Sequence, residues 1–131
     1  IARDQDINAS LPDVPSSDTL AIDPALLLVA EAYRYDIKIV HLARACAMSE
    51  SHFRKIFLRL MGVSPLEYLN RYRIKRAMYL LQTTSNPISH IAEECGFLSV
   101  TTFNRNFQRY NDTSPSQWRN ENALHGKTAH L

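Results

Sequence analysis

The chain has 131 residues, 45% of them hydrophobic and 21% charged, which suits one folded domain and excludes a disordered tail. With three glycines it lacks the composition of phosphate-binding loops or a turn-dense β-sandwich, and no apolar run is long enough to span a membrane. The formal net charge is +2, but residues 1–23 hold five aspartates against Arg3, so the remaining chain is basic and suits a polyanionic partner.

Residues 1–23 contain prolines and aspartates without apolar periodicity, and we interpret them as an acidic linker or the remnant of an upstream domain. The chain begins with Ile1 and shows no signal-peptide pattern, so we expect a fragment of a longer cytoplasmic protein. Two cysteines are too few for a disulfide scaffold, which agrees with that compartment. The predicted domain covers residues 24–120, and residues 121–131 are a predicted C-terminal tail.

Helix starts are marked where a capping side chain precedes a proline. The four places are Asp23-Pro24, Ser64-Pro65, Asn86-Pro87 and Ser114-Pro115. Proline is tolerated at the first helical position because its missing N–H would have no partner there. Glu67 and Gln117 follow the two serines by three residues, the spacing of a capping box. We therefore predict that four helices begin at these points.

The chain also repeats itself. With an offset of 50 residues the matched positions are Ser49 and Ser99, Phe53 and Phe103, Phe57 and Phe107, Ser64 and Ser114, and Pro65 and Pro115. With an offset of 49 they are Leu42 and Ile91, Ala43 and Ala92, Cys46 and Cys95, and Ala47 and Gly96. Each copy contains a short helical stripe, a tight turn and a second helical stripe. This is the pattern of a helix-turn-helix, predicted twice, within residues 24–63 and 82–120.

Residues 64–81 separate the two copies and predict a helix of about 27 Å, since each residue adds about 1.5 Å. Apolar residues on most of its sides indicate that it packs against both copies. It would hold them at a separation comparable to the ~34–36 Å helical turn of DNA. The predicted fold is all-α, with two helix-turn-helix subdomains joined by a long central helix.

The second helix of each copy carries a polar stripe opposite its apolar one. Arg and Lys side chains bond the edge of guanine, and Asn and Gln pair with adenine. The predicted base contacts are Ser51, His52, Arg54, Lys55, Val100, Thr101, Asn104, Arg105 and Gln108. The predicted phosphate contacts are Ser49, Arg59, Arg73, Lys75, Ser99 and Arg109. A merely solvated helix face is the alternative, and the recurrence of the same face in a basic body favours DNA.

Catalytic and metal sites are not indicated. Cys46 and Cys95 both fall in the apolar stripe, as expected of small buried thiols. The five histidines are dispersed and no paired cysteine spacing occurs, so no metal and no cofactor is predicted. Glu93 and Glu94 are adjacent on a helix and point in different directions, unlike a catalytic carboxylate pair. The chain is therefore predicted not to be an enzyme.

With these residues in view, residues 24–120 resemble the DNA-binding domain of the AraC/XylS family of bacterial transcription regulators. The most specific matches are Ile91-Ala92, Gly96-Phe97, Ser99, Phe103, Arg105, Phe107, Ser114-Pro115 and Arg119. The first copy matches at Leu42-Ala43, Met48-Ser49, Phe53, Phe57, Gly62, Ser64-Pro65 and Tyr68. Three positions depart from the family pattern: Asp112 replaces a glycine expected to be left-handed, Lys55 replaces an arginine, and Leu58 replaces a basic residue.

The resemblance implies seven helices, with recognition helices at residues 50–61 and 100–111. It also implies a sequence-specific regulator, in most members an activator, that inserts both helices into successive major-groove segments on one face of double-stranded DNA. RNA polymerase is an implied partner, and a small-molecule effector would act through an upstream domain outside this sequence.

Two alternatives remain open at this point. Methyl-accepting DNA-repair regulators carry the same kind of DNA-binding domain beside a zinc-bound cysteine domain, but no four-cysteine cluster occurs here. The helix-turn-helix pair could instead be a protein-interaction module without DNA function, to which the modest charge and Leu58 lend some weight.

Overall fold

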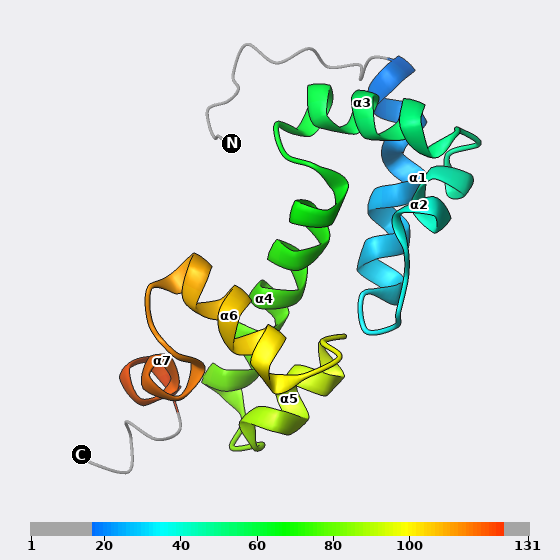
Figure 1. The fold of residues 1–131 in the computed structure, drawn as a ribbon. Coiled ribbons are helices and arrows are strands. Elements are labelled where there is room, and N and C mark those ends of the chain that lie inside the picture. Colours follow the sequence, from blue (N-terminus) through cyan, green and yellow to red (C-terminus); the bar gives the residue numbers. More distant parts are fainter. Residues whose placement is uncertain (1–16, 125–131) are drawn as a thin grey trace.

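The computed structural model describes residues 17–124 of the chain, and this part is built from seven α-helices without strands. They are α1 (Ser17–Ala32), α2 (Ile39–Ala45), α3 (Glu50–Met61), α4 (Pro65–Thr83), α5 (Ile88–Glu94), α6 (Val100–Asn111) and α7 (Pro115–Asn122). Figure 1 shows α4 running from the group formed by α1, α2 and α3 to the group formed by α5, α6 and α7. The predicted all-α fold with a long central helix is confirmed.

Each group of helices has its own hydrophobic core, and α4 contributes to both. Leu69, in the first half of α4, is buried with Phe53 and Phe57 of α3. Ile74 and Leu81, in its second half, are buried in the other core, among Ile91, Ala92, Phe103 and Phe107. The central helix is therefore shared by the two subdomains, which agrees with its apolar character on most sides.

The two halves repeat the same packing. Phe57 of α3 meets Tyr68 of α4 edge-on with ring centroids 5.5 Å apart, and Phe107 of α6 meets Trp118 of α7 in the same way at 6.0 Å. Four serine caps are present as well, and those of Ser64 and Ser114 confirm two of the predicted helix starts. Ser49, Ser64, Ser99 and Ser114 each accept a hydrogen bond from the backbone N–H three residues later, at 3.1 to 3.2 Å. The repeat in sequence is thus a repeat in structure.

Two predicted helix starts are wrong. Helix α1 begins at Ser17, so Pro24 lies inside it and residues 17–23 are helical rather than linker. Ile22, Ala25 and Val29 form a stripe that is almost completely buried, and this burial outweighs the backbone hydrogen bond that the proline removes. Residues 1–16 of the predicted linker lie outside the described residues.

The second error concerns Asn86, which does not cap a helix. Helix α5 begins at Ile88 with Pro87 at its N-cap, while the N–H of Asn86 donates to the hydroxyl of Thr84 at 3.3 Å and so belongs to the turn that ends α4. Helices α4 and α7 each continue two residues beyond their predicted ends, to Thr83 and Asn122. Residues 125–131 of the predicted tail lie outside the described residues.

Left-handed backbone occurs at corresponding positions of the two halves. Gly62 and Asp112 end α3 and α6 with φ of 76° and 58°, which confirms the conformation expected at Asp112. Ala47 and Gly96 occupy the helix-turn-helix turns with φ of 57° and 95°. Alanine pays a steric cost in this region that glycine does not.

Replacing Ala47 with glycine is therefore expected to stabilise the protein by about 0.5–1 kcal/mol, because relief of the left-handed strain exceeds the added freedom of the unfolded chain. Ala45→Gly is the matched control, since Ala45 is exposed in the last turn of α2 and glycine there is expected to cost about 0.5–1 kcal/mol. Urea denaturation measures both free energies of unfolding, and a change of the same sign in the two variants would contradict the argument.

Candidate nucleic-acid interface

The polar stripes of α3 and α6 lie on the surface. Every predicted base-contact residue is exposed: Ser51, His52, Arg54, Lys55, Val100, Thr101, Asn104, Arg105 and Gln108. The opposite sides of the helices are anchored by fully buried aromatic residues, Phe53 and Phe57 in α3 and Phe103 and Phe107 in α6. Each helix is thus held by one side and presents the other to solvent. The contacts with DNA themselves stay predictions.

The outer face of α3 mixes charge with an apolar residue. Arg54 donates from Nε and Nη2 to Oε2 of Glu50, one turn earlier, at 3.0 and 2.6 Å. Both side chains are close to half exposed, so this pair is screened by solvent and contributes little to stability. Arg54 can therefore exchange Glu50 for a base edge at small cost. Leu58, one turn further along, is 54% exposed and suits an apolar contact.

The outer face of α6 is richer in residues that read bases. Thr101, Asn104, Arg105 and Gln108 follow one another along the exposed side of the helix. Asn and Gln can donate to and accept from adenine at once, and Arg can bond guanine twice. Val100 and Leu98 lie exposed at the start of this helix, and the side chain of Leu98 is 86% exposed. Leu98 was missed in the sequence because it falls in the turn, outside the helical stripe.

Among the predicted phosphate contacts, Ser49, Arg59, Lys75, Ser99 and Arg109 are exposed. Ser49 and Ser99 cap the first turns of α3 and α6, where backbone N–H groups and the helix dipole favour an anion. Lys75 borders an open groove of about 470 Å³ lined by Met61, Val63, Tyr68, Arg71 and Tyr72, between the end of α3 and α4. The exposure of the five predicted residues is compatible with contacts to a phosphate backbone. They are Ser49, Arg59, Lys75, Ser99 and Arg109.

Arg73 does not lie where a phosphate contact requires it. Its side chain is buried, and it donates from Nε to the carbonyl oxygen of Tyr33 at 2.8 Å and from Nη2 to that of Tyr35 at 2.9 Å. Burial lowers the pKa of this guanidinium from its ordinary value. Arg73 therefore binds the backbone that follows α1, and its assignment to phosphate is corrected. Arg76, three residues later, contacts the same tyrosine, donating from Nε to the side-chain hydroxyl of Tyr33 at 3.2 Å.

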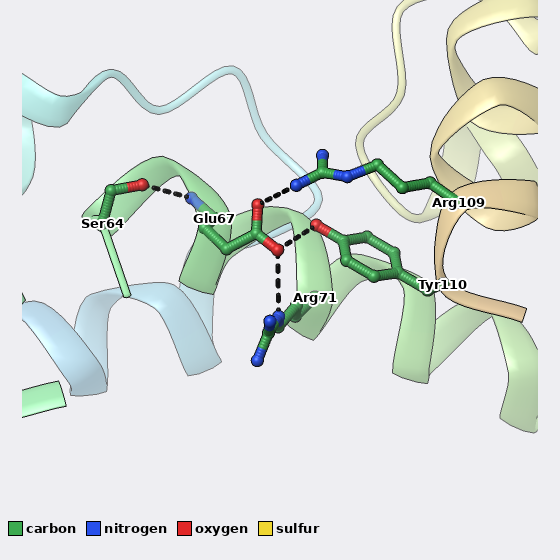
Figure 2. Close-up of polar contacts among 5 residues, drawn as sticks. All are labelled: Ser64, Glu67, Arg71, Arg109 and Tyr110. Atoms are coloured by element: carbon green, nitrogen blue, oxygen red, sulfur yellow. Dashed lines mark hydrogen bonds and ion pairs between the residues drawn. The ribbon is translucent and has the colours of Figure 1, made fainter. Parts of the chain in front are cut away.

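Glu67 forms a polar cluster that the sequence did not predict (Figure 2). Its carboxylate accepts from Arg109 Nη2 at 2.6 Å, from the Tyr110 hydroxyl at 2.8 Å and from Arg71 Nε at 3.0 Å. Ser64 caps its backbone N–H, but the carboxylate points to α6 and not back to the start of α4, so only the serine half of the predicted capping box is seen. We call Glu67, Arg71, Arg109 and Tyr110 the Glu67 cluster. The guanidinium of Arg109, one of the predicted phosphate contacts, is thus paired with Glu67.

The two cysteines are free thiols that directly follow α2 and α5. Cys95 is fully buried, and burial raises its pKa to about 11, so the thiol stays protonated at neutral pH. Cys46 is half-buried, and burial also raises its pKa. Within residues 17–124, no group of three or more His, Cys, Asp or Glu side chains could hold a metal ion. In the same part of the chain, no helix combines the length and apolar character needed to cross a membrane.

A family model described as a helix-turn-helix domain matches residues 42–121. The HTH-type transcriptional activator RhaR of Escherichia coli O1:K1 / APEC is 32% identical over 114 residues, which cover 87% of this chain and 40% of RhaR. The chain spans less than half the length of the curated relatives it matches.

Solved structures share the fold. The DNA-binding domain of AdpA, a global transcriptional factor crystallised with a target DNA, is 30% identical with a TM-score of 0.71, covering 76% of this chain and 92% of that one. A transcriptional regulator from Chromobacterium violaceum, of the group containing AraC-type DNA-binding domains, matches with a TM-score of 0.74 at 24% identity. That match covers 81% of this chain and 95% of the other, and it supports the fold alone.

Proposed function

We propose, from the premise that the chain belongs to the AraC/XylS family of DNA-binding transcription regulators, that it recognises a specific double-stranded DNA site with α3 and α6. The matched family and relatives are regulators and not enzymes, which leaves the methyl-accepting repair alternative without support. The observation that carries the proposal is the pair of exposed polar faces, one on each helix, repeated in two units that share the rigid helix α4.

The dimensions of the molecule support simultaneous binding by both helices. Helix α4 has 19 residues and so a length of about 28 Å, to which the width of packed helices adds about 8–10 Å. The turn of B-form DNA is about 34–36 Å, so α3 and α6 can enter successive major-groove segments on one face. The preferred site is then asymmetric, because the outer faces of α3 and α6 carry different side chains.

The finer features of the proposal follow from the relatives. RhaR is named as an activator and AdpA was crystallised with a target DNA, which favours an activator that binds duplex DNA in the cytoplasm. Contact with RNA polymerase, and a small-molecule effector bound by a further domain, extend this proposal to the whole protein. A protein-interaction module without DNA function is the second candidate, and the 54% exposure of Leu58 in the middle of α3 is the observation that favours it.

Selection of preferred sites from random duplex DNA tests the proposal, and a salt titration on the selected site separates the two candidates. Arg59 and Lys75 are exposed cations assigned to phosphate that stand outside the Glu67 cluster, so the logarithm of affinity should fall with the logarithm of salt concentration with a slope of about −2 or steeper. Affinity that does not depend on salt, or selection that recovers no common sequence, would contradict DNA recognition and leave the interaction module.

A further inference from the structure

The Glu67 cluster joins parts of the protein that belong to different recognition units. Glu67 lies in the first turn of α4, whereas Arg109 and Tyr110 lie in the last turn of α6, the second recognition helix. Figure 2 shows the side chains of Arg109 and Tyr110 reaching from α6 to the carboxylate on α4. The cluster therefore makes a contact that neither hydrophobic core provides.

On the side of α4, the cluster is tied firmly to the first recognition helix. Tyr68, next to Glu67, packs edge-on against Phe57 of α3 at 5.5 Å. Pro65 and Leu69, on either side, are buried in the first half of the molecule. Since Ser64 also caps the backbone N–H of Glu67, this turn of α4 moves as one body with α3.

On the side of α6, the hydrophobic contacts with α4 lie further along α4. The second core joins α6 to Ile74, Ala77 and Leu81, in the latter half of α4, and the ring of Tyr110 packs against the same core. These contacts fix α6 within the second half of the molecule, but they do not reach the first turn of α4. The bond from Tyr110 and Arg109 to Glu67 adds a second, distant point of attachment, and it lies at the end of α6 that follows the buried Phe107.

The geometry of the cluster is that of a strong polar contact. All three hydrogen bonds end on a carboxylate that is only 17% exposed, and two of them come from guanidinium groups. The guanidinium groups of Arg109 and Arg71 also lie 5.0 and 5.8 Å from the centre of the Tyr110 ring. Burial raises the pKa of Glu67, but the hydrogen bonds from Tyr110, Arg109 and Arg71 outweigh it and the pKa is lowered, so the carboxylate is ionised at neutral pH.

We propose that Glu67 is a positioning residue that fixes α6 relative to α3 and thereby sets the number of base pairs the protein accepts between its two major-groove segments. This rests on the proposed function. One added base pair moves the second segment by about 3.4 Å along the DNA and by about 35° around it. Base contacts require hydrogen-bond geometry, so a pair of helices held in fixed register cannot follow that change without losing one set of contacts.

The test compares the selected DNA site with two others in which one base pair is added or removed between the two segments. Binding of wild type, Glu67→Ala and Tyr110→Phe to each duplex gives a spacing ratio, the affinity for the selected site divided by that for the altered one. Glu31→Ala is the matched control: it removes the same charge from an exposed position of α1, away from the contact between α4 and α6. Using a ratio cancels the general gain in DNA affinity that follows from losing a negative charge.

We expect a wild-type spacing ratio of roughly 30 or more, the size of losing two base contacts of one helix at about 1–3 kcal/mol each. For Glu67→Ala the ratio should fall to about 5 or less, because a freed α6 can follow the altered site. Tyr110→Phe should lower the ratio by a smaller factor, because Arg109 still bonds Glu67 in this variant. Glu31→Ala should keep the wild-type ratio. Tyr110→Phe removes a single hydroxyl and keeps the ring. A ratio below that of wild type in this variant supports the proposal even if Glu67→Ala fails to fold, and an unchanged ratio contradicts it.

Each other outcome is decisive as well. A wild-type ratio that survives in Tyr110→Phe and Glu67→Ala overturns the proposal, as does a wild-type protein that binds all three spacings equally while still preferring its own sequence. In both cases the proposed function stands. If the wild type prefers no sequence at all, the proposed function itself is wrong and the inference falls with it.

Discussion

Replacing both Asn104 and Arg105 with alanine is expected to remove most of the preference of this protein for its own DNA site over random DNA. Both side chains are exposed on α6, on the side opposite the buried Phe103 and Phe107. Each bidentate contact with a base is worth about 1–3 kcal/mol of discrimination, so losing two should reduce the specificity ratio by roughly 30-fold to 10⁴-fold. Affinity for random DNA should fall much less, because phosphate contacts supply it.

Competition binding between the selected site and a scrambled duplex measures this ratio. Combining Arg34→Ala with Asn120→Ala is the matched control, since it removes one guanidinium and one amide from exposed positions outside α3 and α6. We expect the control to keep the wild-type ratio. If the Asn104 and Arg105 double variant keeps it too, α6 does not read bases with this face, and the assignment of the interface is wrong.

The limits of the two recognition helices are implied by the family resemblance, and local signals explain them. The predicted ranges 50–61 and 100–111 agree with α3 and α6 as observed. Ser49 and Ser99 cap each start, and the left-handed Gly62 and Asp112 end each helix. Caps and left-handed ends act over three or four residues, so they can be recognised in sequence without knowledge of the rest of the fold. The start of α1 could not be predicted because it depends on burial of Ile22 against α2 and α3.

The exposed positions of the interface could also be predicted, since the repeat indicates which side of each helix is buried. What could not be predicted is how the charged residues pair. Arg73 lies in a basic run that suggests a solvated surface, yet it bonds carbonyl groups 38 and 40 residues away. Glu67 follows a local capping pattern but directs its carboxylate to Tyr110, 43 residues away. Such pairs form only when the helices pack, so no local spacing in the sequence predicts them.

Replacing Gly96 with alanine is expected to destabilise the protein by about 2–5 kcal/mol, more than any other single glycine substitution in residues 17–124. Gly96 has φ of 95° in the turn between α5 and α6, where a Cβ atom would overlap the carbonyl oxygen of Tyr33 and lie 2.8 Å from Nε of Arg73. The obstacle is backbone on one side and a buried guanidinium on the other, so neither can move aside easily. The alanine also carries the strain of a left-handed residue.

Gly62→Ala separates these two costs. Gly62 has φ of 76° at the end of α3, but nothing lies within 4 Å of the position its Cβ would take. Its replacement should therefore cost only the backbone strain, about 1–2 kcal/mol, measured as the free energy of unfolding in urea. The difference between the two variants reports the close approach of the second helix-turn-helix to the end of α1. Equal losses of stability in the two variants would mean that the turn between α5 and α6 moves away from Tyr33 and Arg73 at no cost. The junction between the two halves would then be looser than the hydrogen bonds of Arg73 imply.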